Sequence, residues 1–363
     1  MTASTDAIGG VDARSPENPR EAIDAELADF LEEERGHLLA VSADLAPVAN
    51  LASDYLDGGK RLRPAFAYWG WRAAGGEPCL GIIRAAASLE LLQACALIHD
   101  DVMDASDTRR GRPSAHRRFE SHHAAADWDG NAEAFGSGAA ILLGDLFLAW
   151  SDQLFSASGL PDEALRRGRP LFDAMRTELM AGQYLDLVVQ SLPKPDRTAI
   201  GTVLRYKSAK YTIEHPLQLG ALLGGADDGL VAGLSDFGLP LGEAFQLRDD
   251  LLGVFGDPAV TGKPAGDDLR EGKQTLLIAV AFESSDEQQR DVLRAGLRNR
   301  DLDDDGVARI RDVLQSTGAV TAIEQEIGVR RDAAMQALAR LELPVTARGA
   351  LTALAEAAVK RIR

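Results

Sequence analysis

Apolar residues recur at three- and four-residue spacing along almost the whole chain after Asn18-Pro19. This spacing is typical of amphipathic helices. No stretch alternates apolar and polar positions as a half-buried strand would. The pattern therefore predicts an all-α fold, a single large bundle of ten or more helices. It is clearest over residues 25–39, 65–74, 82–104, 136–155, 171–189, 198–224, 228–255, 303–318, 319–341 and 345–363.

The same pattern predicts how the chain is organised. Residues 1–18 are polar, with Gly, Ser and Pro mixed in, and are expected to form a flexible N-terminal tail. Residues 121–137 interrupt the apolar periodicity and predict a loop insertion. No linker or internal repeat divides the remainder, so residues 19–363 are expected to form one all-α domain.

Charge and cysteine content narrow the class of protein. The 363 residues carry a formal net charge of -17, which disfavours nucleic-acid binding because such a surface repels phosphate backbones. Two cysteines, neither in a CxxC pair, fit a reduced, cytoplasmic setting better than a disulfide scaffold. The N-terminus lacks the apolar core of a secretory signal, and we expect no transmembrane segment because charges interrupt each long apolar run.

A first group of carboxylates ends the apolar stretch 82–104. Asp100 and Asp104 are four residues apart and share a helical face, with Asp101 beside them. Like charges at this spacing destabilise a helix unless a cation compensates them. Oxygen-only ligands favour Mg²⁺, and the arginines at 109 and 110 suit a metal-bridged phosphate. The competing explanation is a solvated acidic helix end.

A second group lies roughly 150 residues later. Asp249 and Asp250 lie near the end of the apolar stretch 228–255, and lysines follow at 263 and 273. Asp267 and Asp268 suit either a helix N-cap pair or this acidic group. Two such helix ends facing each other across a cavity would hold several Mg²⁺ ions and a diphosphate. Coincidence explains both groups less well than it explains either one.

Basic residues elsewhere suit a second anion. In GGKRLRP, two glycines allow a sharp turn, and Lys60 and Arg63 follow at the start of the next helix. Gln93 lies seven residues, or about two turns, before Asp100. Lys207 and Ser208 place an ammonium beside a hydroxyl. Solvated charges at a turn, a satisfied core amide and a surface lysine are the structural alternatives.

These segments together resemble the polyprenyl synthetase family of trans-isoprenyl diphosphate synthases, and most of all its bacterial geranylgeranyl diphosphate synthases. The resemblance runs from about residue 25 to the end and rests on GGKRLRP, DDVMD with DTRRG, GDLFL, YKSAKYT and QLRDD…GKPAGDD…GKQT, in the family's order. It implies an all-α bundle around a deep central cavity and a homodimer.

The resemblance also implies a role for each matching residue. The metal ligands would be Asp100, Asp101, Asp104, Asp249 and Asp250, holding three Mg²⁺ ions with the diphosphate. Isopentenyl diphosphate would be bound by Lys60, Arg63, Gln93 and Arg110. The allylic diphosphate would be bound by Arg109, Lys207, Ser208, Gln246, Lys263 and Lys273. One departure is notable, because Gly253 stands where the family's second motif ends in aspartate.

The implied reaction is head-to-tail prenyl transfer, in which isopentenyl diphosphate attacks an allylic cation. Product length would follow the depth of the cavity below Asp100. The family's short-chain members carry aromatic residues where this chain has Cys95 and Ala96, with Leu92 another turn down. Small side chains there favour geranylgeranyl diphosphate. A farnesyl or longer-chain synthase, a class I terpene cyclase and a noncatalytic partner subunit remain alternatives.

Overall fold

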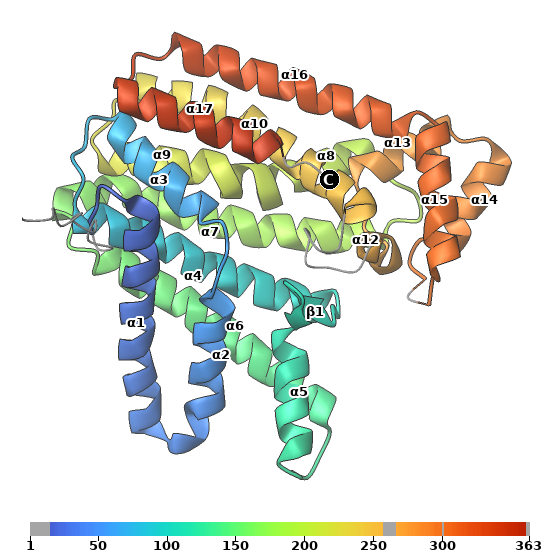
Figure 1. Ribbon diagram of the computed structural model, residues 1–363, viewed down its shortest axis with the longest axis horizontal. Helices are drawn as coiled ribbons and strands as arrows, with labels where there is room; N and C mark the ends of the chain where they lie inside the picture. The colour runs from blue at the N-terminus through green and yellow to red at the C-terminus, as the bar shows by residue number, and fades with distance from the viewer. Residues whose placement is uncertain (1–14, 257–265, 300, 361–363) are drawn as a thin grey trace, which may run out of the picture.

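The computed structural model describes residues 15–256, 266–299 and 301–360, and it confirms the predicted all-α fold (Figure 1). Within these residues one two-residue hairpin provides the strands, β1 (Thr108–Arg109) and β2 (Arg112–Pro113). The helices are α1 (Pro19–Val41), η1 (Ala43–Leu45), α2 (Ala46–Leu56), α3 (Leu62–Ala73), α4 (Leu80–Met103), α5 (Ala115–Ala125), α6 (Ala132–Ser156), α7 (Asp162–Ser191), α8 (Arg197–Val203), η2 (Leu204–Glu214), α9 (His215–Leu223), α10 (Asp228–Phe255), α12 (Asp267–Glu271), α13 (Leu276–Ser284), α14 (Glu287–Gly296), α15 (Asp304–Ser316), α16 (Ala319–Arg340) and α17 (Val345–Val359).

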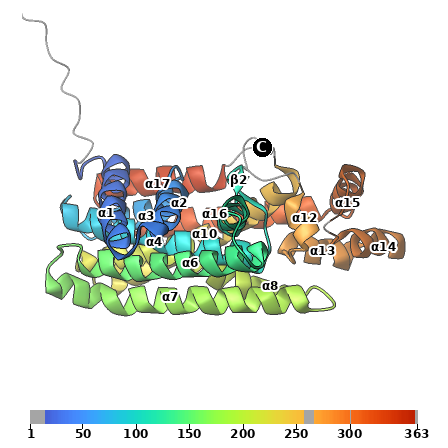
Figure 2. The ribbon, with the colours of Figure 1, turned by 90° about the horizontal axis from the view of Figure 1, so that it is seen from below.

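The long helices stack in layers. Seen from below, α7 forms one outer layer, α6 lies above it, and α17 lies on the far side (Figure 2). The helices α1, α2 and α5 run at a steep angle to the long helices of the bundle (Figure 1). Two groups of buried apolar side chains fill the interior, one centred on α4, α6 and α7 and the other on α10, α13 and α16. Trp69 packs against both groups and so joins them.

Close contact with α9 fixes the position of α3, the helix that follows the GGK turn. α3 crosses α9 at two glycines, one on each helix. A β-carbon built on Gly70 would lie 2.0 Å from the carbonyl oxygen of Leu217, and one built on Gly220 would lie 1.8 Å from that of Ala67. Both distances are far inside van der Waals contact. The two backbones can therefore approach only because neither position carries a side chain.

The sequence predicted no apolar segment long enough to cross a membrane, but two helices reach that length and composition. By length and composition alone, α4 and α6 are apolar enough to cross a membrane. The most apolar window of α4 is 78% buried inside the protein, and its role as a core helix accounts for its hydropathy. The corresponding window of α6 is only 28% buried. This helix leaves apolar surface that the described part of the chain does not cover.

Two predicted boundaries need correction. The loop insertion predicted over 121–137 is wrong, because α5 continues to Ala125 and α6 begins at Ala132. Asn131 caps α6 by accepting a hydrogen bond from the Ala134 amide, which explains how a helix restarts within this polar stretch. The predicted tail lies mostly outside the described residues, although 15–18 form a turn whose Pro16 carbonyl accepts a hydrogen bond from Tyr68.

Candidate functional site

A cavity of about 960 Å³ opens between the C-terminal ends of α4 and α10. Its wall also includes the turn before α3 and parts of α7, α8, η2 and α12. Most residues predicted from the sequence line it, although they come from segments more than 200 residues apart. Those are Lys60, Arg63, Gln93, Ala96, Asp100, Arg109, Arg110, Lys207, Ser208, Gln246, Asp249, Asp250 and Lys273. The predicted Lys263 lies outside the described residues.

Asp100 is the centre of a charged network at the end of α4. Its Oδ1 accepts hydrogen bonds from Lys207 Nζ and from Gln183 Nε2, each at 3.0 Å. Lys207 Nζ also lies 2.7 Å from Asp186 Oδ2, so its ammonium bridges carboxylates on two helices. Burial would raise the pKa of Asp100, but Lys207, Lys273 and Arg109 outweigh it and hold that pKa below its usual range. The carboxylate is therefore ionised and ready to bind a cation.

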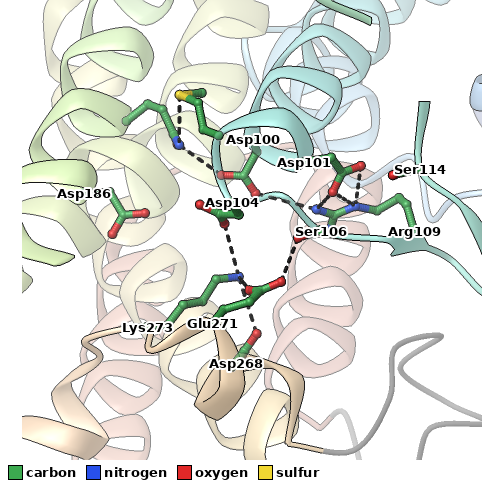
Figure 3. Close-up of polar contacts among 12 residues, drawn as sticks. Asp100, Asp101, Asp104, Ser106, Arg109, Ser114, Asp186, Asp268, Glu271 and Lys273 are labelled. Carbon is green, nitrogen blue, oxygen red and sulfur yellow. Dashed lines mark hydrogen bonds and ion pairs between the residues drawn. The ribbon is translucent and has the colours of Figure 1, made fainter. Parts of the chain in front are cut away.

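Asp101 has different surroundings from its neighbour. Its side chain is fully buried and does not line the cavity. It accepts hydrogen bonds from both Nε and Nη2 of Arg109 (Figure 3). It also accepts one from the Tyr55 hydroxyl at 2.9 Å. Burial would lower the pKa of Arg109, but Asp101 raises it and keeps the guanidinium charged. This geometry makes Asp101 a residue that orients Arg109, and direct metal binding by Asp101 stays a prediction.

Asp104 is also buried and does not line the cavity itself, but it lies next to Lys273, which does. Lys273 Nζ lies 3.9 Å from Asp104 Oδ2, 3.4 Å from Asp268 Oδ1 and 3.0 Å from Glu271 Oε2 (Figure 3). The ammonium thus joins the end of α4 to α12. Burial and the nearby charge of Asp100 raise the pKa of Asp104 to about 7, although Lys273 opposes this. A divalent cation that binds at Asp104 would keep its carboxylate ionised at neutral pH.

Asp249 and Asp250 lie in the C-terminal part of α10, before its end at Phe255, and line the cavity. Burial raises the pKa of Asp250 to about 7, although the carboxylate accepts a hydrogen bond from Gln246 Nε2 at 2.8 Å. The alternative that Asp267 and Asp268 form an N-cap pair is wrong. Gly266 occupies the N-cap position of α12, and Asp268 lines the cavity.

The basic turn before α3 forms another part of the cavity wall. Arg63 donates a hydrogen bond to Thr212 Oγ1 at 2.8 Å and stacks over the Tyr211 ring with 4.4 Å to its centroid. Two buried polar atoms of cavity-lining residues, Arg63 Nε and Gln93 Oε1, have no hydrogen-bond partner among the described residues. Buried polar atoms without partners are uncommon and indicate a place where a polar ligand binds.

The predicted chain-length residues separate into two kinds. Ala96 lines the cavity one turn below Asp100. Cys95 points toward α6 instead, where its Sγ lies 3.7 Å from His99 Nδ1 and His99 contacts the Ile141 carbonyl. Leu92 is fully buried in the core and does not line the cavity. The structure therefore places one of the three in the cavity wall.

The site contains residues that sequence reasoning missed. Gln183 and Asp186 of α7 both contact the Asp100–Lys207 pair. The signal was present, because two polar residues three positions apart interrupt an otherwise apolar helical face. Lys207 and Ser208 lie on η2, a π-helix of 11 residues. π-Helical turns are rare and occur often at functional sites, but nothing in the sequence pattern predicts them.

The described residues contain no group of three or more Asp, Glu, His or Cys side chains close enough together to hold a metal ion unaided. Such spacing suits Mg²⁺, which usually takes one or two carboxylates, keeps several waters and completes its shell with substrate phosphates. The donors at the two helix ends are all carboxylate oxygens, as this ion prefers. The residues present therefore fit Mg²⁺ bound together with a diphosphate.

Comparisons with known proteins identify the relatives of this chain. The model of the polyprenyl synthetase family matches residues 46–314. A geranylfarnesyl diphosphate synthase from Aeropyrum pernix is 31% identical over 78% of this chain and 84% of its own. The octaprenyl diphosphate synthase of Escherichia coli is 32% identical over 84% and 87%. A geranylgeranyl pyrophosphate synthase from Corynebacterium glutamicum, solved with isoprenyl diphosphate and magnesium, has a TM-score of 0.91 and 40% identity, covering 96% of this chain and 99% of that one.

Proposed function

The chain belongs to the polyprenyl synthetase family and is a trans-isoprenyl diphosphate synthase, and we propose that it joins isopentenyl diphosphate to an allylic diphosphate in the cavity between α4 and α10. One observation carries the assignment of the site. Carboxylates near the C-terminal ends of α4 and α10 line one cavity together with basic side chains from the turn before α3, the β1–β2 hairpin, η2 and the segment after α12. That arrangement suits two diphosphates whose prenyl groups meet between them.

The carboxylates are proposed to hold Mg²⁺. Asp100 and Asp104 would contribute from α4, and Asp249 and Asp250 from α10. Three Mg²⁺ ions would bind there with the diphosphate, as the family resemblance implies. When bound, the metal stabilises the negative charge that develops on the departing diphosphate. Support comes from the all-oxygen donor set and from the magnesium in the Corynebacterium glutamicum structure.

The allylic diphosphate is proposed to lie among the cations near α4 and η2. Arg109, Lys207 and Lys273 would neutralise its charge, with Ser208 and Gln246 as further hydrogen-bond donors and Lys263 as the remaining predicted contact. As the allylic carbon–oxygen bond breaks, its electron pair leaves with the diphosphate. Cations already fixed by Asp101, Asp100 and Asp186 need little reorganisation at that moment, which is how preorganised charge lowers a barrier.

Isopentenyl diphosphate is proposed to bind beside the turn before α3, held by Lys60, Arg63, Gln93 and Arg110. Its double bond attacks the allylic carbon and forms the new carbon–carbon bond. A proton then leaves from the adjacent carbon, with the released diphosphate as the acceptor. Apolar wall residues such as Leu179, Val203 and Phe245 would keep water from the cation.

We propose geranylgeranyl diphosphate as the product. Ala96 leaves the wall open below Asp100, where a bulky residue would stop the chain from growing at a shorter length. The relatives named above make products of different lengths by their names, so a longer chain is the main alternative. A farnesyl product is disfavoured by the small side chain at Ala96.

A homodimer is proposed from the apolar surface on α6 and α7. Leu142 is 65% exposed and Tyr184 67% exposed, and Phe135, Ile141, Met180 and Val188 lie on the same two helices. An exposed apolar surface of this kind commonly marks a protein interface. A cytoplasmic location is proposed as well, since both Cys79 and Cys95 are free thiols.

The test is incubation of the purified protein with Mg²⁺, labelled isopentenyl diphosphate and each allylic starter, with products sized by chromatography. The proposal predicts incorporation of label into one dominant all-trans prenyl diphosphate. Release of diphosphate from an allylic substrate without isopentenyl diphosphate would instead favour a terpene cyclase. A folded protein with no turnover would favour a noncatalytic subunit.

A further inference from the structure

The turn before α3 contains a buried arginine that no proposed substrate contact uses. Arg61 directly follows Lys60, and its side chain is 6% exposed. Its guanidinium donates to three separate elements, reaching Asp24 of α1 at 2.6 Å, Glu90 of α4 at 3.0 Å and the Leu56 carbonyl at the end of α2 at 2.6 Å. A single side chain therefore connects the turn to α1, α2 and α4.

The backbone at Arg61 is strained. Its φ of 50° and ψ of 38° lie in the left-handed region, which is unfavourable for any residue with a β-carbon. Arg110 has a φ of 53° as well. The two side chains meet at Gly59, where a built β-carbon would lie 3.3 Å from Arg61 Nη1 and 3.5 Å from Arg110 Nη2. Strain of this kind persists only where surrounding contacts fix the conformation, and it concentrates at functional sites.

The strained residue separates the two cations of the turn. Lys60 precedes Arg61 and Arg63 follows it by two residues, and both line the cavity together with Glu90 and Gln93. A change of φ and ψ at Arg61 would turn Lys60 away from the start of α3, because every atom before the rotated bonds moves with them. The relative direction of Lys60 and Arg63 thus depends on the conformation that the buried guanidinium holds.

We infer that Arg61 is a positioning residue for isopentenyl diphosphate: anchored by Glu90, Asp24 and Leu56, it fixes the turn so that Lys60 and Arg63 converge on one diphosphate. The inference rests on the proposed function of this end of the cavity. Two simpler roles make different predictions. A purely structural role would affect stability alone, and a purely electrostatic role would follow the net charge near the anion.

Glu90 separates positioning from electrostatics because the two predict opposite signs. Its carboxylate lies in the cavity wall and interacts with Arg110 as well as Arg61. If charge alone matters, Glu90→Gln removes a negative charge near the substrate and strengthens anion binding. If positioning matters, the same change weakens the anchor of Arg61 and therefore weakens binding. Arg61→Lys keeps the charge but loses the planar set of donors that reaches three elements.

The experiment compares Arg61→Lys and Glu90→Gln with the wild type and with Arg84→Lys as a matched control. Arg84 also joins α4 to α1, through Glu26 at 2.7 Å, but does not line the cavity. Equilibrium dialysis with labelled isopentenyl diphosphate gives Kd, steady-state kinetics give both KM values and kcat, and thermal melting reports folding. We expect both site variants to raise Kd and KM for isopentenyl diphosphate about tenfold. The KM for the allylic substrate and kcat should change less than about threefold, and Arg84→Lys should leave every constant unchanged.

Several results would overturn the inference: an unchanged Kd in folded Arg61→Lys, tighter binding in Glu90→Gln, or an equal loss in Arg84→Lys. If Arg61→Lys does not fold, the direction of the Glu90→Gln effect decides. Lys60→Gln distinguishes failure of the inference from failure of the proposed function. If the wild type does not bind isopentenyl diphosphate, the function is wrong. If Lys60→Gln weakens binding and Arg61→Lys does not, only the positioning role is wrong.

Discussion

The carboxylate of Asp268 on α12 lies directly against Gly253 on α10. A β-carbon built on Gly253 would be 1.8 Å from Asp268 Oδ2, so no larger residue fits without displacing that carboxylate. Gly253 is also the position where this chain departs from the aspartate of its family's second motif. The carboxylates at this wall of the cavity therefore come from two helices instead of one.

This contact predicts that Gly253→Ala is destabilising. Alanine in place of glycine within a helix usually stabilises it by about 1 kcal/mol, but here the new methyl group displaces Asp268. We expect a lower melting temperature and weaker Mg²⁺-dependent diphosphate binding. Gly328→Ala on α16 is the control, since a β-carbon there meets nothing within 4 Å and should stabilise the protein. A Gly253→Ala variant as stable as that control would show that Asp268 is free to move.

Lys207 predicts a loss in the chemical step. It contacts both Asp100 and Asp186 and faces the proposed leaving group. Lys207→Gln should lower kcat roughly 100-fold, as expected when a preorganised charge is removed from a developing anion, while the KM for isopentenyl diphosphate changes little. Lys210→Gln is the control, because Lys210 is on the same π-helix but pairs with Glu178 and Glu214. Equal losses in both variants would contradict this role.

Product length should depend on Ala96 and not on Cys95. Ala96→Phe places a ring in the cavity below Asp100, and we expect the dominant product to shorten by at least one isoprene unit. Cys95→Ser leaves the cavity wall untouched and should give the wild-type product, since Cys95 faces His99 and α6. Chromatographic sizing of the products tests both. An unchanged product from Ala96→Phe would place the growing chain elsewhere.

The buried carboxylate of Asp104 predicts a pH-dependent stability difference. Its pKa of about 7, against an ordinary value of 3.8, means that the folded protein retains a proton between these values that the unfolded chain has lost. The ionised carboxylate therefore lowers stability increasingly as pH rises from about 4 to 7, and by a constant amount above that. Asparagine is neutral throughout.

Asp104→Asn should accordingly be stabilising relative to the wild type in the absence of Mg²⁺, and more so at pH 8 than at pH 5. The extra stabilisation at pH 8 relative to pH 5 should be on the order of 3 kcal/mol, from roughly two pH units at about 1.4 kcal/mol each. Denaturant unfolding at both pH values measures it. Adding Mg²⁺ with diphosphate should stabilise the wild type and not the variant. A difference that shrinks as pH rises would contradict the sign.

Much of the site was predictable because its residues break local rules. Clustered carboxylates within long apolar helices repel one another, so Asp100 and Asp249 are conspicuous in the sequence. The GGK turn stands out for the same kind of reason, since glycines there precede closely spaced cations. Helical periodicity alone was enough to predict the fold class.

The remaining features depend on contacts between distant segments. Asp101 has the same local pattern as Asp100, and only the packing of Tyr55 and Arg109 shows that it faces away from the cavity. Arg61 resembles any solvated charge at a turn until Glu90 is placed beside it by α4. Likewise, the direction of Cys95 follows from the approach of α6, which no local pattern encodes.

We propose above all that the carboxylates of α4 and α10 jointly bind one diphosphate together with Mg²⁺. Titration calorimetry of inorganic diphosphate, with and without Mg²⁺, tests it most directly on the wild type, Asp100→Asn and Asp249→Asn. The account predicts Mg²⁺-dependent binding to the wild type that either single substitution weakens at least tenfold, with folding retained. Full-strength binding in either folded variant would contradict it.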